Sequence, residues 1–312
     1  MASIQRYLDA AVHFFFNRNG AVMVTKQAGQ ISIQRLQLGI ATAAIAIGTS
    51  YGSVACAQTV PLGDLLLRGI QVLQVSNLSK QQEMQLGAQM HQNLLSKGTK
   101  LYTNAELNQY VQEIGQRLAV NSRRVPFRFY IVQSPSVNAF ATMGGYVYIT
   151  TGLLKAADNE AQVASVMAHE MGHIEKRHLL SQIQNAMLTR GLLATALGTD
   201  QNQLANMGAE LLVSRPQSRE DEYEADQEGL RLLRGANYAT GAMPAFMRKL
   251  LRPGNSGPVF LSTHPAIPNR LKVLEQTIRT GPQNQCDMNA PPKSCGLDRT
   301  SYQARLQRNG LY

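Results

Sequence analysis

The chain has 312 residues, 44% of them hydrophobic and 16% charged, and its formal net charge at pH 7 is +10. This is enough for one sizeable hydrophobic core, and the lack of an internal repeat of fixed period argues against a solenoid. The positive charges are scattered singly, and aromatic residues make up only 6%. We therefore expect a solvated basic surface that could meet an anionic membrane, and no nucleic-acid partner.

Residues 1–57 are predicted to form an export segment. Basic residues precede an uncharged run over residues 36–50, and the segment ends in the small residues Ala55, Cys56 and Ala57. This order is typical of a signal peptide with an A-x-A cleavage pattern, whereas a spanning helix needs about 20 apolar residues. A retained anchor and a lipid attached to Cys56 are the alternatives. In each case the sequence indicates an exported protein of the periplasm or envelope.

Two capped helices follow the export segment. Ser79 and Gln82 have the capping-box spacing at the start of a helix over residues 80–97. Asn104 is the predicted cap of a second helix, which ends near residue 120 and has its apolar side chains on one stripe.

A short run of strands is predicted next. Phe127, Phe129 and Ile131 alternate along one face, which is typical of a half-buried strand. Two more short strands around Gly144 and Gly145 indicate a hairpin, because strong strand formers follow the two glycines. A hairpin directly before a long helix is a good position for an edge strand.

The next part of the chain is predicted to be helical. Asp158 is the candidate cap of the first helix, and residues 178–213 form a helical region whose apolar pieces are interrupted by polar residues. Three more helices are expected over about 218–234, 239–251 and 265–279. Helices, then a small sheet, then helices again predict an α+β fold with segregated elements.

The stretch VASVMAHEMGHIEKRHLL contains the pattern H-E-x-x-H. His169 and His173 are one helical turn apart and would project from the same face, where two imidazoles can hold one Zn²⁺. Glu170 lies too far around the helix to be a third ligand, but it can take a proton from a water on the metal's open side. The pattern is therefore typical of metallopeptidases, although pairs of histidines also occur on helices that bind no metal.

A third ligand is expected from the acidic helix that follows. Glu222 and Asp226 share one face of this helix, and Glu220 and Glu224 share another. If Glu222 reaches the metal, Asp226 can hydrogen-bond to the second nitrogen of a ligand histidine and fix its tautomer. The alternative is a solvated acidic helix that pairs with nearby arginines. Further along, His264 lies in a proline-rich loop, where a histidine is usually a surface residue.

Taken together and in this order, HEMGH, EYEAD and STHP followed by NR resemble the zinc endopeptidase family that includes HtpX, BepA, LoiP and the CAAX prenyl proteases. The segment VNAFATMGGYVYITTGLL is also similar to that family, and the resemblance covers about residues 80–280. It implies a mainly helical, zincin-like metallopeptidase of the gluzincin type, with a small β-sheet or hairpin before the active-site helix and one Zn²⁺ per chain. The small exported bacterial members are the most similar.

The resemblance also implies a role for each matching residue. The implied metal ligands are His169, His173 and Glu222. Glu170 becomes the general base, and Asp226 orients a ligand histidine.

Further roles concern the substrate. His264 is implied to gate the site or to assist in the transition state. Asn138 is implied to bind substrate, together with an edge strand from Gly144 to Tyr148 that includes Gly145 and Tyr146. Arg270 matches the family arginine after the H-P pair, and we group it with the substrate-binding residues.

The sequence thus predicts three parts. The export segment or anchor covers residues 1–57, the zinc metallopeptidase domain residues 58–280 and a C-terminal tail residues 281–312. In the tail, Cys286 and Cys295 flank a turn-rich loop, and in an oxidising compartment they can form a disulfide.

We expect this protein to be a zinc-dependent endopeptidase that cleaves misfolded or misassembled envelope proteins with weak sequence selectivity. Its partners would be unfolded proteins and, through the basic surface, a membrane. The alternative is an envelope chaperone or assembly factor in which the metal is structural, or in which the loop around His264 holds the site shut.

Overall fold

The computed structural model describes residues 13–16, 22–25, 77–120, 122, 124–190, 205–208, 210–211, 218–251, 259–265, 267–289 and 291–312. They belong to two units, Met1–Gln58 and Thr59–Tyr312. In the first unit, β1 (His13–Phe16) and β2 (Val22–Thr25) form an antiparallel pair that the sequence did not suggest. The predicted apolar run and cleavage pattern lie outside the described residues, so the signal peptide and its alternatives stay predictions.

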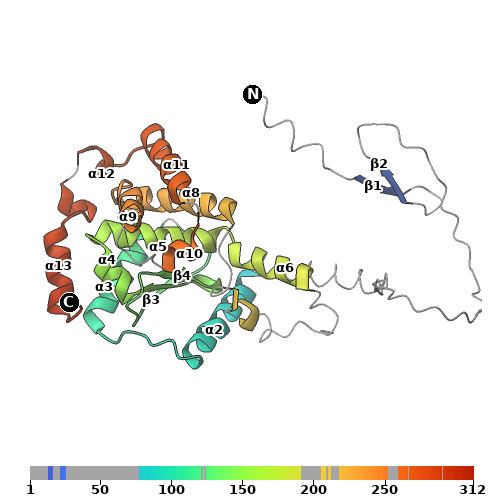
Figure 1. Ribbon diagram of the computed structural model, residues 1–312, viewed down its shortest axis with the longest axis horizontal. Helices are drawn as coiled ribbons and strands as arrows, with labels where there is room; N and C mark the ends of the chain where they lie inside the picture. Colours follow the sequence, from blue (N-terminus) through green and yellow to red (C-terminus); the bar gives the residue numbers. More distant parts are fainter. Residues whose placement is uncertain are drawn as a thin grey trace, which may run out of the picture. The chain divides into compact units, whose positions relative to one another are not determined.

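The second unit is mainly helical with one small sheet, which confirms the predicted α+β class (Figure 1). None of the helices in the described part of the chain combines the length and the hydropathy needed to cross a bilayer. In chain order the elements are α2 (Lys80–Ser96), α3 (Ala105–Ala119), β3 (Arg128–Val132), β4 (Ala139–Ala141), the 3-10 turn η1 (Met143–Gly145), β5 (Tyr146–Thr150), α4 (Thr151–Ala156), α5 (Glu160–Glu175), α6 (His178–Arg190), α8 (Arg219–Gly235), α9 (Ala242–Leu250), α10 (Val259–Thr263), α11 (Ile267–Thr280), α12 (Gln285–Met288), the 3-10 turn η3 (Pro292–Cys295) and α13 (Arg299–Arg308).

The first two of these helices begin where their caps predict. Ser79 and Gln82 form both hydrogen bonds of the capping box at the start of α2, and the Asn104 side chain caps α3.

The predicted cap of α5 was wrong by one residue. Asn159, not Asp158, accepts the hydrogen bond from the backbone N–H of Gln162, at 3.0 Å. The Asp158 carboxylate instead pairs with the Lys249 ammonium at 2.7 Å. Asp158 therefore forms a tertiary ion pair, although its position in the sequence is that of a helix cap.

The sheet has the order β3-β5-β4, with β5 parallel to β3 and antiparallel to β4. The predicted hairpin is present as β4, η1 and β5. The expectation that the strand from Gly144 to Tyr148 lies at a sheet edge is wrong, because β3 pairs with the far side of β5 and makes it central. The edge strand of the hairpin is β4.

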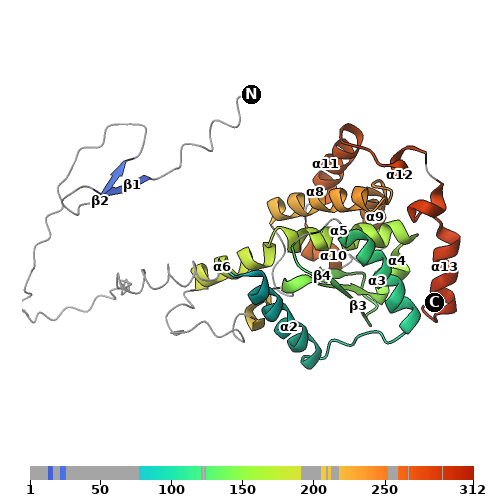
Figure 2. The same ribbon diagram turned by 180° about the vertical axis from the view of Figure 1, so that it is seen from behind.

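Alternating side chains direct the two faces of this sheet to different helices. Phe129 and Ile131 belong to the main core, which they share with α3 and α5. Tyr146 and Tyr148 point the other way and pack with Leu94 of α2. Accordingly, α2 lies on one side of the sheet and α5 on the other (Figures 1 and 2). This arrangement encloses the helix that carries HEMGH.

The C-terminal segment packs on the same core. Tyr302 and Leu306 of α13 are buried in it. Cys286 and Cys295 form a disulfide, and the Gly296 carbonyl just beyond it accepts a hydrogen bond from the Ala161 backbone N–H at 2.8 Å. The segment therefore supports the first turn of α5.

Candidate metal centre

The helix α5 is enclosed on all sides. Every residue from Ala161 to Ile174 is buried, which is typical of a helix at the centre of a domain. His169, Glu170 and His173 are therefore polar side chains in the interior. Buried polar groups need partners, and a second helix supplies them for the two histidines.

The partner helix α8 lies directly against α5 (Figure 1). Two glycines on the facing surfaces allow this close approach. A Cβ atom on Gly172 would lie 2.7 Å from the Ala225 carbonyl oxygen, and one on Gly229 would lie 3.2 Å from the His169 backbone nitrogen. A side chain at Gly172 would push the helices apart, so the glycine in HEMGH brings the carboxylates of α8 within reach of the histidines.

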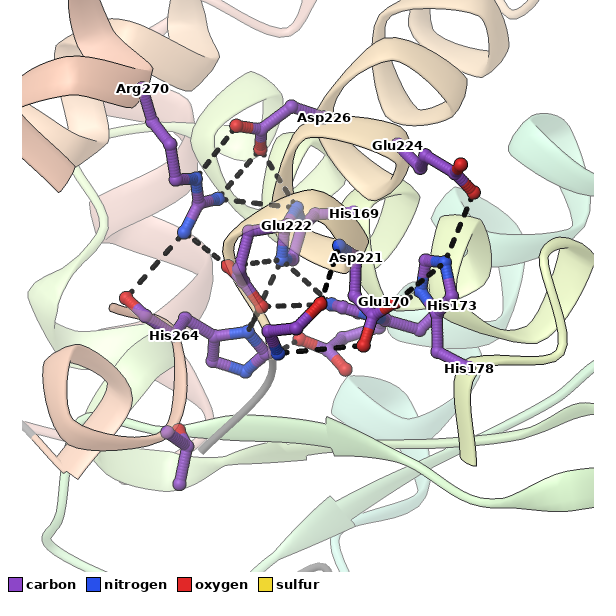
Figure 3. A network of polar contacts seen from close by, with 12 residues as sticks. His169, Glu170, His173, His178, Asp221, Glu222, Glu224, Asp226, His264 and Arg270 are labelled. Atoms are coloured by element: carbon purple, nitrogen blue, oxygen red, sulfur yellow. Dashed lines mark hydrogen bonds and ion pairs between the residues drawn. The ribbon is translucent and has the colours of Figure 1, made fainter. Parts of the chain in front are cut away.

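Four side chains converge on one point between α5, α8 and the loop after α10 (Figure 3). The Nε2 atoms of His169 and His173 are 3.1 Å apart, and the Glu222 carboxylate lies 3.5 Å from the first and 3.4 Å from the second. His264 Nδ1 lies 2.9 Å from Glu222 Oε1 and 3.3 Å from His169 Nε2. One candidate ligand atom from each of the four buried residues lies within 4.8 Å of all the others.

A second layer of contacts holds these side chains from behind (Figure 3). Asp226 Oδ1 lies 2.9 Å from His169 Nδ1, the nitrogen that faces away from the cluster. Arg270 donates two hydrogen bonds of 2.7 Å to Asp226, and it also donates to Glu222. Arg270 is fully buried. The structure thus places it behind the candidate ligands, and not among the substrate-binding residues where the sequence grouped it.

The cluster favours a positive charge. Burial alone would lower the pKa of His169, but hydrogen bonds to Asp226 and Glu222 raise that pKa to about 9. Burial lowers the pKa of His173 to about 3, although Glu222 opposes this shift. Burial also opposes ionisation of Glu222, yet His264, His169 and His173 hold the pKa of its carboxyl well below its usual range. A proton on His169 or a metal cation can supply the positive charge.

A cleft of about 270 Å³ opens beside the cluster, and both Glu170 and His264 line it. Glu170 Oε1 is buried and has no hydrogen-bond partner among the described residues, although His264 Nε2 is 3.4 Å away. Burial raises the pKa of the Glu170 carboxyl, whereas the nearby His264 and His169 lower it. A buried carboxylate oxygen with a free lone pair is well placed to accept a proton from a molecule in the cleft.

Only some of the remaining predicted residues line the cleft. Asn138 and Gly144 line the cleft, whereas Gly145 and Tyr146 are buried and do not. Sequence reasoning missed His178, a buried histidine five residues after His173 that hydrogen-bonds to it. Its spacing from HEMGH, in HEMGHIEKRH, was the available signal.

Two imidazoles one helical turn apart, a glutamate from a second helix and an adjacent glutamate that lines the cleft define a site of the metallopeptidase class. Comparison with known proteins identifies the family. Residues 103–278 match the model of peptidase family M48, and the chain belongs to that family. The resemblance read from the sequence motifs is thereby confirmed.

Several characterised proteins are similar to this chain. The beta-barrel assembly-enhancing protease of Escherichia coli (strain K12) is 35% identical over 213 residues, which cover 63% of this chain and 44% of that protein. Metalloprotease LoiP of the same strain is 30% identical over 227 residues, 70% of this chain and 88% of that protein. The mitochondrial metalloendopeptidase OMA1 of Arabidopsis thaliana is 34% identical over 153 residues, 49% of this chain and 32% of that protein. The chain thus spans less than half the length of the first of these relatives.

Proposed function

We propose that this protein is a zinc-dependent endopeptidase in which His169, His173 and Glu222 hold one Zn²⁺. One observation carries the proposal. The Nδ1 atoms of His169 and His173 have partners outside the cluster, so their Nε2 lone pairs, 3.1 Å apart, point at each other and at the Glu222 carboxylate. A metal cation satisfies this arrangement, and nitrogen and oxygen donors from two helices suit zinc.

The protein's own residues supply the proton transfers. When bound, a zinc ion would act as a Lewis acid on the scissile carbonyl and lower the pKa of a water molecule. Glu170 lines the cleft, and its Oε1 has no hydrogen-bond partner among the described residues. It takes the proton from the attacking water and passes it to the leaving amine. Asp226 holds His169 in the tautomer that presents Nε2, and Arg270 holds Asp226.

We assign substrate binding to the edge of β4 that does not pair with β5. Asn138 and Thr142 make backbone hydrogen bonds to β5, so alternation directs the backbone groups of Ala139 and Ala141 to the side that faces away from β5. Ala141 and Asn138 also line the cleft, and the buried Asn138 Oδ1 has no hydrogen-bond partner among the described residues. An extended peptide can add to this edge through its backbone, which gives affinity with little sequence selectivity.

The proposal is tested by removing the metal. The purified full chain is expected to contain zinc at one per molecule and to cleave casein, an unfolded substrate. A chelator should abolish cleavage, and stoichiometric zinc should restore it. The buried donors alone do not catalyse the reaction once the ion is lost. Casein cleavage that continues in chelated protein with no measurable zinc would refute the proposal.

The position of His264 favours a second state of the same site. Its Nδ1 lies within the cluster, 2.9 Å from Glu222 and 3.3 Å from His169, where it can act as a fourth ligand and take the place of a substrate. This is the arrangement expected if the site is held shut, as in the chaperone or assembly-factor alternative.

Replacing His264 with alanine should therefore raise casein cleavage several-fold, because it opens the fourth position without touching the other three donors. The control is Ser262→Ala, which changes an exposed side chain on α10, the short helix just before His264. A rate for His264→Ala below that of the wild type would contradict gating and favour a role for His264 in the transition state.

We further propose that the clients are misfolded or misassembled proteins of the envelope. The name of the beta-barrel assembly-enhancing protease links a similar protein to the assembly of β-barrels. The disulfide between Cys286 and Cys295 suits an oxidising compartment, as does the export segment predicted for residues 1–57. Fusing residues 1–57 to a reporter and locating it would test this part, and a cytoplasmic reporter would contradict it.

A further inference from the structure

The two histidines of HEMGH are supported from behind in different ways (Figure 3). The outer nitrogen of His169 meets the Asp226 carboxylate at 2.9 Å. The outer nitrogen of His173 meets a third histidine, with a distance of 2.8 Å between His173 Nδ1 and His178 Nδ1. His178 is the first residue of α6, and its side chain is buried.

The chain turns between α5 and α6, directly before His178. Between α5 and α6, Arg177 has a φ of +61°, in the left-handed region that residues with a side chain rarely adopt. After this turn the rings of His173 and His178 meet edge to face, with their centroids 4.9 Å apart. An unfavourable backbone conformation is thus maintained where it places an imidazole against a candidate ligand.

The partners of His178 define its tautomer. Its Nε2 lies 3.3 Å from Glu224 Oε2 and 3.7 Å from Asp221 Oδ1. Ionised carboxylates only accept hydrogen bonds, so Nε2 carries the proton, and in the neutral ring Nδ1 is left with a lone pair. His173 must then donate from its own Nδ1, which leaves the lone pair of His173 Nε2 directed at the cluster.

We propose that His178 is a positioning residue of the metal centre, whose Nδ1 holds His173 in the tautomer and orientation that present Nε2 to the ion. Asp226 holds the tautomer and orientation of His169 in the same way. The two supports differ in chemistry, because Asp226 is a buried carboxylate, whereas His178 is an imidazole that in turn contacts Glu224 and Asp221 on α8. The inference rests on the proposed function, since it concerns the same zinc site.

Two nearly isosteric variants separate positioning from packing. In His178→Asn the amide oxygen can occupy the place of Nδ1 and still accept from His173. In His178→Gln the amide reaches the place of Nε2, toward Glu224. It leaves no hydrogen-bond acceptor for His173 at the place of Nδ1. His178→Phe keeps the ring volume and loses both nitrogens. The measurements are the zinc dissociation constant of the full chain, by competition with a chromophoric chelator, and the visible absorption spectrum of the Co²⁺-substituted protein.

His178→Gln and His178→Phe should bind zinc about tenfold or more weakly than the wild type and shift the Co²⁺ spectrum, because such supporting contacts are worth roughly 10–100-fold in affinity. His178→Asn should stay close to the wild type in both measurements. Thermal unfolding of the metal-free variants controls for folding. If the Phe variant does not fold, the comparison of the Asn and Gln variants still tests the positioning role. Equal weakening by Asn and Gln, or no weakening by any variant, would overturn this inference alone. A wild-type chain that binds no zinc would overturn the proposed function as well.

Discussion

Replacing Glu170 with glutamine should abolish measurable casein cleavage and leave zinc bound at one per chain. The amide keeps the size of the side chain, but it cannot take a proton from water. A positioned general base is worth roughly 10²–10⁴-fold in rate. Glu170 is not one of the four clustered residues, so the donors for the metal stay in place.

The comparison needs both activity and metal content for each protein. Glu220→Gln is the matched control, because it makes the same chemical change on an exposed side chain of α8. It should cleave casein at the wild-type rate. Cleavage by Glu170→Gln at the wild-type rate would remove Glu170 from the mechanism.

Replacing Arg270 with methionine should destabilise the metal-free protein by about 3–5 kcal/mol, because removing one partner of a buried ion pair leaves uncompensated charge. Arg270 is fully buried, and it is the cation that Asp226 and Glu222 share. Methionine fills much of the space but carries no charge and donates no hydrogen bond. Both carboxylates would then lose a donor inside the core.

Urea unfolding of metal-free wild type and variant measures this difference. The control is Arg248→Met, whose partner Glu275 is 46% exposed and which is itself 55% exposed. An exposed pair of this kind contributes about 0–1 kcal/mol, so the control should change stability little. Equal and small losses for both variants would show that Arg270 is not needed to hold the two carboxylates together.

The local features of this protein could be predicted because their causes are local. Helix starts depend on side chains within three residues, and Ser79 and Asn104 accordingly cap helices as expected. The spacing of His169 and His173 predicts that they share a face once the segment is helical, whatever surrounds it. For the same reason the pairing of Glu222 with Asp226 on one face of α8 could be read directly from the sequence.

The failures occurred where distant parts of the chain meet. Asp158 was expected to cap a helix, but a lysine from α9 holds it. The strand before the active-site helix was expected at an edge, but pairing with β3 makes it central and leaves the edge to β4. Neither outcome is encoded in the spacing of nearby residues.

By itself the sequence determined the protein family, the two helices that carry the candidate ligands and the residues on each ligand-bearing face. Only the tertiary structure decided that Arg270 lies behind the ligands, that His178 hydrogen-bonds to His173 and that His264 enters the cluster. Periodicity tells which side of an element a residue occupies, whereas what that side meets depends on how separate elements pack. The charges and hydrogen bonds of the metal centre arise from that packing.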